Sequence, residues 1–423
     1  MIDNEKVINE IGTPAYVYDV AAIEDRIKYL RDKLGAAILY AVKANSFIVK
    51  EIEEEIDGYE ICSKGEFDIC NSLNINRGKM VISGVHKDRP SIEEMMEKYD
   101  DIYKYTIESV NQWKLLTDVA KKYGRKITTL IRLTSGNQFG VSPEDLKYII
   151  ANNDESVIKI AGIEYFSGTQ KHSIKKINKE ADKLIDLIDS LREELNFEVE
   201  EIEYGPGLPI FYYQGEEFDE EAFLDEVRLA LDRIKEKGVK LSLEVGRSLV
   251  AKAGRYYSAV VDMKSNKNGN FIILDGGINH LVYYGGTLGM RIPHFQVVRI
   301  TDEEAINLND DTQVEKIDKN VKAVDATSGE PVVGTEDENG LITYNLHGSL
   351  CTVNDILVKN INSKRLKLGD VFVFENVGAY SSTEGISLFL SRDLPKIALY
   401  QKDGSIKVVR DVIKTSEINL PRY

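Results

Sequence analysis

A lysine at the end of an apolar segment is the first residue of this sequence with chemical potential. Lys43 follows Ala36–Tyr40, a short apolar run that predicts a buried strand. A lysine beside a hydrophobic core is costly unless its charge is neutralised or used. Burial favours the neutral amine, which can attack a carbonyl and form an imine. A lysine at a strand end can also extend its head into solvent, so Lys43 alone does not establish a function.

Two later segments supply groups that would complement such a lysine. Gly205 and Gly207 form a Gly-x-Gly turn, whose backbone N–H groups can approach a phosphate closely. Glu244 can hold a ring nitrogen in its protonated form, and Gly246 with Arg247 can bind a phosphate or a carboxylate. Each feature alone has an ordinary explanation, a tight turn or a structural salt bridge. In this order along the chain they suit pyridoxal phosphate.

The elements that would position these residues alternate between short apolar strands and amphipathic helices from about residue 22 to residue 265. The expected strands are Ala36–Tyr40, Tyr59–Cys62, Met80–Ser83, Lys104–Thr106, Thr128–Leu133, Ile158–Phe166, Val199–Tyr204 and Lys240–Glu244. Eight strands that alternate with helices over this length predict an α/β fold, a (β/α)8 barrel. In such a barrel the functional groups lie where strands end.

The pattern changes after residue 265, where helical periodicity is scarce and an all-β domain is expected. Its predicted strands are Asn270–Asp275, Gln296–Ile300, Val321–Ala323, Asp370–Val373 and Lys396–Gln401, and its predicted loops are Asp302–Lys319 and Gly334–Gly340. Asn268-Gly269 and Asp403-Gly404 are candidate hairpin turns. The opening segment Ala15–Asp19 is also strand-like and can pair with this sheet. We therefore predict a barrel over residues 22–265 and a β domain made of residues 1–21 plus 266–423.

Composition narrows the classes of function. The chain has 423 residues, 43% of them hydrophobic and 29% charged, which is ordinary for a globular protein. A formal net charge of −16 argues against nucleic-acid binding, which requires a positive field. Cys62, Cys70 and Cys351 are too scattered for a disulfide framework or a zinc site, so no metal is expected. With no signal peptide and no apolar run of membrane-spanning length, we expect a cytoplasmic protein without a membrane partner.

The ordered motifs resemble those of the fold-type III pyridoxal-phosphate decarboxylases, which include diaminopimelate, ornithine and arginine decarboxylases. The resemblance extends from about Gly12 to Pro395. The segments that carry it are Tyr40–Asn45, Cys62–Phe67, Ser83-Gly84 with Lys87, Phe139–Val141, Ser167–Gln170, Tyr204–Gly207, Glu244–Arg247, His347–Asp355 and Gly378–Tyr380.

This resemblance implies a role for each matching residue. Lys43 would carry pyridoxal phosphate as an imine (the internal aldimine), and Glu244 would bond its pyridinium nitrogen. Cys351 would be the proton donor in decarboxylation, with Lys43 as the alternative donor. In this family the active site lies at a dimer interface, so a homodimer is implied, with Cys351 and Asp355 provided by the second subunit. The residues expected around the phosphate are Gly205, Gly207, Gly246, Thr169, Tyr380 and Arg247. Those expected to contact the substrate are Arg247, Arg291, Thr352, Asp355 and Tyr380.

Three positions depart from the family pattern. Phe166 stands where a histidine usually stacks on the cofactor, and a phenyl ring can stack but carries no titratable proton. Pro206 interrupts the usual run of three glycines and lacks an N–H group. Thr352 follows Cys351, where diaminopimelate and ornithine decarboxylases place an acidic residue that holds the distal ammonium of the substrate. Threonine cannot provide the opposite charge that a desolvated ammonium needs.

These departures point to a pathway-specific decarboxylase whose substrate lacks a distal ammonium. Leu350-Cys351-Thr352 and the Met290-Arg291 stretch resemble biosynthetic decarboxylases of natural-product clusters, one of which acts on a glutamyl thioester of an acyl carrier protein. An acidic carrier would need a local basic patch on a chain of net charge −16. The alternatives are a diaminopimelate decarboxylase and an amino-acid racemase. A cofactor carrier is disfavoured by the long β domain, and an inactivated regulator by Lys43, Glu244 and Cys351.

Overall fold

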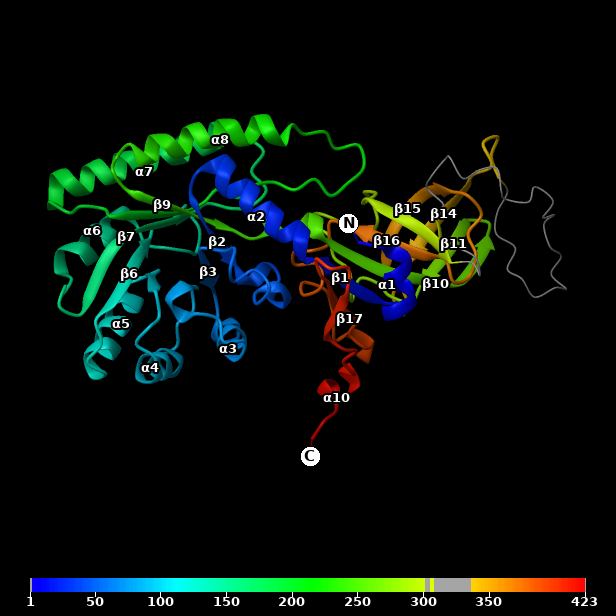
Figure 1. The fold of residues 1–423 in the computed structure, drawn as a ribbon, viewed down its shortest axis with the longest axis horizontal. Coiled ribbons are helices and arrows are strands. Elements are labelled where there is room, and N and C mark those ends of the chain that lie inside the picture. Colours follow the sequence, from blue (N-terminus) through cyan, green and yellow to red (C-terminus); the bar gives the residue numbers. More distant parts are fainter. Residues whose placement is uncertain (1, 301–304, 308–335, 423) are drawn as a thin grey trace. The chain divides into compact units, whose positions relative to one another are not determined.

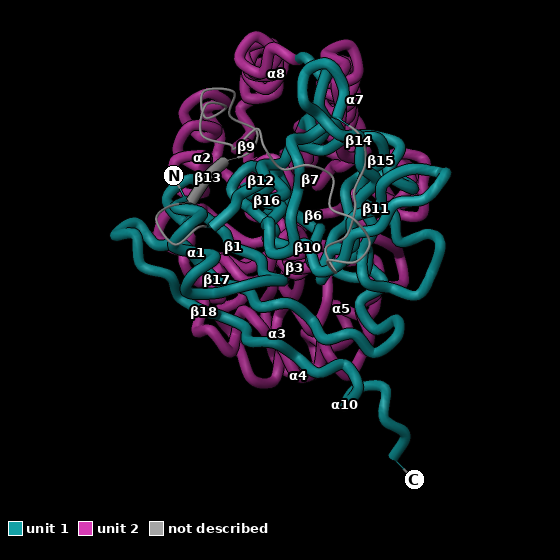
Figure 2. Tube along the Cα trace, turned by 90° about the vertical axis from the view of Figure 1, so that its right-hand side faces the viewer, with its two compact units in different colours: residues 1–22, 211–217, 250–423 teal, residues 23–210, 218–249 magenta. Residues whose placement is uncertain are grey.

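The computed structural model describes residues 2–300, 305–307 and 336–422, and the chain divides into two compact units. The first, the barrel unit, comprises residues 23–210 and 218–249. The second, the sheet unit, comprises residues 1–22, 211–217 and 250–423. Figure 2 colours the barrel unit magenta and the sheet unit teal.

The barrel unit contains the predicted (β/α)8 fold. Its strands form a closed parallel barrel in chain order, with β9 returning to pair with β2 (Figure 1). The strands are β2 (Ala37–Ala41), β3 (Gly58–Ile61), β4 (Met80–Ile82), β5 (Lys104–Ile107), β6 (Ile127–Arg132), β7 (Ile158–Phe166), β8 (Glu201–Gly205) and β9 (Lys240–Val245). Every predicted barrel strand overlaps one of these, because buried parallel strands are short continuous apolar runs that the sequence reveals.

Helices alternate with these strands. They are α2 (Val20–Leu34), α3 (Lys64–Ser72), α4 (Arg89–Lys98), α5 (Val110–Lys122), α6 (Pro143–Asn152), α7 (Ile174–Leu195), α8 (Glu220–Lys235) and the short α9 (Arg247–Val250), with single turns at Val42–Ala44, Ser46–Ile48 and Arg77–Lys79. Several of them begin at a side-chain cap. Ser63, Ser109 and Ser142 each accept a hydrogen bond from the backbone N–H three residues on, which satisfies a donor that the helix leaves unpaired.

Polar side chains on the strands distinguish the interior of this barrel. Glu60, Thr106, Glu164 and Glu203 are at most 1% exposed, although barrel interiors are usually filled by branched apolar residues. Lys104 of β5 forms an ion pair with Glu201 of β8, two strands that are not neighbours, so both side chains cross the interior. Burying charged groups costs free energy, so the interior of this barrel must serve a purpose besides close packing.

The sheet unit begins with α1 (Asn4–Ile11) and β1 (Ala15–Asp19). Its other elements are β10 (Gly254–Asn266), β11 (Gly269–Leu274), β12 (Phe295–Ile300), β13 (Ala305–Asn307), β14 (Ile342–His347), β15 (Ile356–Ser363), β16 (Val371–Glu375), β17 (Lys396–Tyr400), β18 (Ile406–Arg410), α10 (Thr415–Asn419), and single turns at Ala251–Ala253 and Phe389–Ser391. The main path of the sheet runs β13-β12-β16-β10-β1-β17-β18, and β11, β14 and β15 branch from β10. β1 pairs antiparallel with β10 and parallel with β17, so both ends of the chain build this sheet.

The predicted boundary at residue 265 is wrong. β10 starts at Gly254 and pairs with β1 and β16, which places it in the sheet unit. Its alternating aromatic and aliphatic residues fit either a barrel strand or a sheet strand, and pairing decides between them. Residues 211–217, predicted within the barrel, also belong to the sheet unit, where Gln214 donates its backbone N–H to the carbonyl of Ile292.

The remaining differences concern the β domain. β10, β13, β14, β15 and β18 were not predicted. In β14 and β15 buried residues alternate with exposed polar ones, which makes the strands less distinct in the sequence. The predicted strand Val321–Ala323 lies outside the described residues. Within the predicted loop Asp302–Lys319, only Ala305–Asn307 is described, and it forms β13. Asn268-Gly269 lies at the turn between β10 and β11, and Asp403-Gly404 at the turn between β17 and β18.

Among the described residues, no helix combines the length and the apolar character needed to cross a membrane.

Candidate active site

The candidate active site of the barrel unit is built around Lys43. This residue lies in the single turn Val42–Ala44 that follows β2, as expected for a residue at the end of a barrel strand. Its Nζ lies 3.1 Å from Oε1 of Glu244 and 3.5 Å from Sγ of Cys62. Glu244 comes from β9, which pairs with β2, and its side chain is only 5% exposed, against 38% for that of Lys43. An amine is thus held at the barrel end beside a buried carboxylate.

The neighbours of Lys43 set its electrostatic environment. Cys62 is a neutral thiol, because burial raises its pKa to about 12 even though the Lys43 ammonium lowers it. The ring of Phe166 lies with its centroid 5.9 Å from Nζ of Lys43. The sequence predicted Phe166 and Lys43 at one site, and the barrel brings them together.

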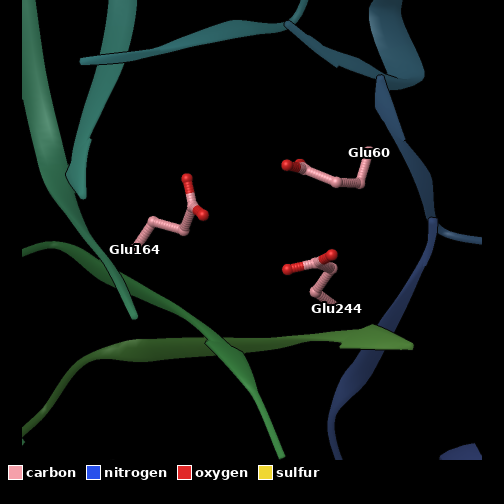
Figure 3. Close-up of side chains that lie close together, drawn as sticks. All are labelled: Glu60, Glu164 and Glu244. Carbon is pink, nitrogen blue, oxygen red and sulfur yellow. The ribbon is translucent and has the colours of Figure 1, made fainter. Parts of the chain in front are cut away.

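Two further carboxylates converge on Glu244, the partner of Lys43. The carboxylate oxygens of Glu60, Glu164 and Glu244 lie within 4.8 Å of one another, and Figure 3 shows the three side chains pointing toward a common centre from β3, β7 and β9. Burial, followed by repulsion from neighbouring carboxylates, raises the pKa of Glu60. Burial also raises the pKa of Glu164 to about 7, although Arg132 opposes the shift. The raised pKa values favour the neutral forms of Glu60 and Glu164, so Glu244 is the carboxylate placed to favour a cationic ring nitrogen.

Strand register accounts for these contacts. Arg132 of β6 lies opposite Glu164 of β7, and its guanidinium contacts Glu164 at 3.3 Å and Glu108 at 3.4 Å. Glu203 of β8 is opposite Glu164 on the other side. Burial raises the pKa of Glu203 to about 8.

No role was predicted for Glu60, Glu164 or Glu203 from the sequence. Their spacing in the sequence nevertheless indicated a place near the site, because side chains two positions apart on a strand lie on the same face. Glu60 precedes Cys62 by two residues, Glu164 precedes Phe166, and Glu203 precedes Gly205.

The glycine turn after β8 is shaped for close approach of a ligand. Phe166 is opposite Gly205 in the pairing of β7 with β8, and a Cβ on Gly205 would come within 2.1 Å of the Phe166 ring. Gly207 has a φ of +62°, and a Cβ there would come within 2.2 Å of the Gly168 carbonyl oxygen. Side chains are therefore excluded at both positions.

The other predicted phosphate residues of the barrel unit lie near this turn. Nε of Arg247 is 3.4 Å from Oγ1 of Thr169, so α9 and the segment after β7 approach each other there. Arg247 is 8% exposed. A Cβ on Gly246 would come within 3.1 Å of the Ala44 Cβ, next to Lys43.

The remaining predicted site residues belong to the sheet unit. Cys351 is exposed, in the segment between β14 and β15. Asp355 is 1% exposed and accepts hydrogen bonds from the backbone N–H groups of Leu350 and Ile278, at 2.7 and 2.9 Å. The Thr352 hydroxyl accepts a hydrogen bond from the backbone N–H of Asn354 at 3.4 Å. The geometry therefore makes Asp355 an anchor of the loop that presents Cys351.

Two predicted residues lie elsewhere in the sheet unit. Arg291 forms an ion pair with Glu216, and its guanidinium carbon lies 3.9 Å from the centroid of the Tyr213 ring. It lines a cavity of about 400 Å³ together with Tyr213 and Tyr283. A substrate carboxylate at Arg291 would therefore compete with Glu216. Tyr380 has a φ of +65° in the turn after β16, where its carbonyl accepts the N–H groups of Thr383 and Glu384.

The fit of pyridoxal phosphate can be tested on these residues. Lys43 matches the aldehyde of the cofactor, the buried Glu244 carboxylate matches its pyridine nitrogen, and Phe166 offers an aromatic face. Gly205, Gly207, Thr169 and Arg247 offer a cradle and a cation for its phosphate. A closed parallel barrel with this set of donors at one end defines a pyridoxal-phosphate enzyme.

Comparisons with known proteins identify the family. The model of the family described as "Pyridoxal-dependent decarboxylase, pyridoxal binding domain" matches residues 20–251, and the chain belongs to this family. It is an amino-acid decarboxylase, a carboxy-lyase that uses pyridoxal phosphate.

Individual relatives cover most of the chain at low identity. The diaminopimelate decarboxylase of Zymomonas mobilis is 26% identical over 443 residues, which cover 96% of this chain and 94% of that protein. The L-glutamyl-[BtrI acyl-carrier protein] decarboxylase of Niallia circulans is 24% identical over 429 residues, 94% of this chain and 91% of that protein. The structure of Methanocaldococcus jannaschii diaminopimelate decarboxylase in complex with L-lysine has a TM-score of 0.77 at 22% identity, covering 98% of this chain and 93% of the other. That similarity shows a shared fold.

Proposed function

We propose that this enzyme decarboxylates an amino-acid substrate that lacks a distal ammonium group, and that it does so as a homodimer. Lys43 attaches the cofactor, and Cys351 of a second subunit donates the proton that replaces the carboxylate. The contact between Lys43 and the buried Glu244, 3.1 Å apart, is the observation that carries the assignment of the cofactor site. Thr352 beside Cys351 carries the assignment of the substrate class.

In this proposal the barrel residues bind and orient the cofactor. Lys43 would hold it covalently, Glu244 would accept a hydrogen bond from its ring nitrogen, and Phe166 would offer an aromatic face to its ring. Gly205, Gly207, Gly246, Thr169, Arg247 and Tyr380 surround its phosphate. When bound, the cofactor acts as an electron sink that stabilises negative charge left on the substrate Cα.

Glu244 maintains the electrostatic conditions for that role. A deprotonated ring nitrogen would be a poorer acceptor of electrons, and Glu244 opposes deprotonation by offering a negative hydrogen-bond acceptor. Because Phe166 has no titratable proton, the ring stacked on the cofactor cannot exchange one with it.

The loop of the sheet unit supplies the proton donor. Cys351 has a thiol, a group that can give up a proton and take one back, which suits proton transfer. Asp355 holds the loop through the backbone N–H of Leu350, directly before Cys351. We propose that Asp355 keeps Cys351 in position and that Arg247, Arg291, Thr352 and Tyr380 face the substrate.

The proposed substrate class rests on Thr352, whose side chain carries no negative charge. A buried substrate ammonium requires a carboxylate partner, because desolvation of an unpaired charge costs several kcal/mol. Threonine offers only a hydroxyl, which here accepts the N–H of Asn354. A glutamyl group, free or as a thioester on a carrier protein, has no distal ammonium. The Niallia circulans relative is named for such a substrate.

Diaminopimelate decarboxylation is the second candidate. Most of the relatives with printed names, such as those of Campylobacter jejuni and Aquifex aeolicus at 27% and 29% identity, are called diaminopimelate decarboxylases. Arg291 in the cavity of the sheet unit offers a cation for a distal carboxylate, provided that Glu216 releases it.

The test is carbon dioxide release in the presence of added pyridoxal phosphate. The substrates are diaminopimelate, lysine, ornithine, arginine, glutamate and glutamate thioesterified to a carrier protein, and Lys43→Ala is the inactive control. We expect release from glutamate or its thioester and at least tenfold less from the diamino acids. If diaminopimelate proves the best substrate, the inference from Thr352 is wrong and the second candidate holds. Deuterium incorporation at Cα without carbon dioxide release would identify a racemase instead.

A further inference from the structure

A buried ionic cluster lies directly behind the glycine turn that follows β8. Lys171, Glu180 and Tyr204 form it. Nζ of Lys171 lies 2.7 Å from Oε2 of Glu180, and the Tyr204 hydroxyl donates to the same oxygen at 2.6 Å. The side chains of Lys171 and Glu180 are 1% and 6% exposed. Ser167 also donates its hydroxyl to Glu180.

Packing alone does not explain this cluster. Glu180 lies on the buried stripe of α7, between Ile177 and Leu184, at the spacing that a helix uses for its apolar face. A buried ion pair is often no more stable than apolar side chains of the same volume. Ion pairs of this kind are most useful where they fix one conformation of the surrounding chain.

The conformation in question is that of the glycine turn. Nζ of Lys171 donates to the carbonyl oxygen of Gly205 at 3.2 Å, and the backbone N–H of Lys171 donates to the carbonyl oxygen of Gly207 at 2.9 Å. A single residue therefore holds both ends of the Gly205-Pro206-Gly207 turn. The middle residue, Pro206, has no N–H group to offer a phosphate.

We propose that Lys171 is a positioning residue for the phosphate of the cofactor. Lys171 binds the two carbonyl groups of the turn and keeps them pointing away from the phosphate. The backbone of Gly207 and its neighbours can then approach the phosphate. This approach compensates for the N–H donor that Pro206 lacks. Glu180 and Tyr204 hold the lysine in place. The inference rests on the proposed cofactor site, and it concerns recognition of the phosphate and not of the pyridine ring.

The test compares pyridoxal phosphate with pyridoxal, which has the same ring and aldehyde without the phosphate. Each is titrated into the cofactor-free protein, and the dissociation constant is read from the absorbance of the bound cofactor. The first variant is the double substitution Lys171→Met with Glu180→Met, which removes the pair without leaving a buried charge. We expect its Kd for pyridoxal phosphate to rise about tenfold or more, the effect of losing one or two hydrogen bonds, while its Kd for pyridoxal changes less than twofold. Lys176→Met, an exposed lysine on α7, is the matched control and should change neither.

Tyr204→Phe provides a second variant that keeps the packing and removes only the hydroxyl. It should weaken binding of pyridoxal phosphate by a smaller factor, again without affecting pyridoxal, and it decides the question if the double variant does not fold. Equal losses for both ligands, or no loss for pyridoxal phosphate, would overturn the proposal. Failure of the wild-type protein to release carbon dioxide would refute the proposed decarboxylation alone, because these measurements record binding.

Discussion

Glu203 allows the electrostatics of the barrel interior to be tested through stability. It is 1% exposed, and within the described residues neither of its carboxylate oxygens has a hydrogen-bond partner that meets ordinary geometry. Burial, followed by repulsion from Glu164 and Glu244, raises its pKa from 4.5 to about 8. We predict that Glu203→Gln removes a pH-dependent destabilisation of the cofactor-free protein.

The direction in which stability changes with pH follows from proton binding. Between pH 4.5 and about 8 the folded protein keeps a proton on Glu203 that the unfolded chain has released. Stability therefore falls as the pH rises through this window, by up to about 1.4 kcal/mol for each pH unit. The full rise of the pKa corresponds to about 5 kcal/mol, and glutamine has no such dependence. Relative to wild type, the variant should gain roughly 10 °C in Tm between pH 5 and pH 9, since 1 kcal/mol corresponds to roughly 2–4 °C for a unit of 150–250 residues.

The assay is thermal unfolding of the cofactor-free protein over this pH range. Glu200→Gln is the matched control, because Glu200 is exposed, ion-paired with Lys159, and directly precedes β8. The control should shift Tm by a similar small amount at every pH. If the curves for Glu203→Gln and wild type stay parallel from pH 5 to pH 9, Glu203 is not protonated in the folded state and the argument is refuted.

Two further predictions concern the loop of the sheet unit. Cys351→Ala should lower kcat about 10²- to 10⁴-fold, which is the usual contribution of a positioned proton donor. The Kd for pyridoxal phosphate should stay within twofold of wild type. An unchanged kcat would exclude Cys351 as the donor. Thr352→Glu should raise the rate of carbon dioxide release from diaminopimelate or lysine relative to the rate from glutamate, because it places a carboxylate where a distal ammonium needs one. If the ratio of these rates is unaltered, position 352 does not face the distal group of the substrate.

The sequence alone was sufficient for the barrel and for the order of its cofactor residues. Strands such as Ile158–Phe166 are short and mostly apolar, so their alternation with amphipathic helices is visible in one sequence. Lys43, the glycine turn and Glu244 stand at strand ends, and a parallel barrel brings all strand ends to one face. The adjacency of Lys43 and Glu244, about 200 residues apart in sequence, was therefore predictable from topology.

The tertiary structure was needed for everything that depends on pairing and on the inward face of a strand. Gly254–Asn266 has a sequence suited to either unit, and its hydrogen bonds to β1 and β16 assign it to the sheet. Glu60, Glu164 and Glu203 would pass for solvent-exposed charges in the sequence, because local sequence does not state which face of a strand is enclosed. Lys171, Glu180 and Tyr204 are spread over 34 positions of the chain, and each is unremarkable alone. Only packing of α7 against the end of β8 places them together in a buried site. A buried ion pair must have its partners, and it can thereby hold a turn in one conformation.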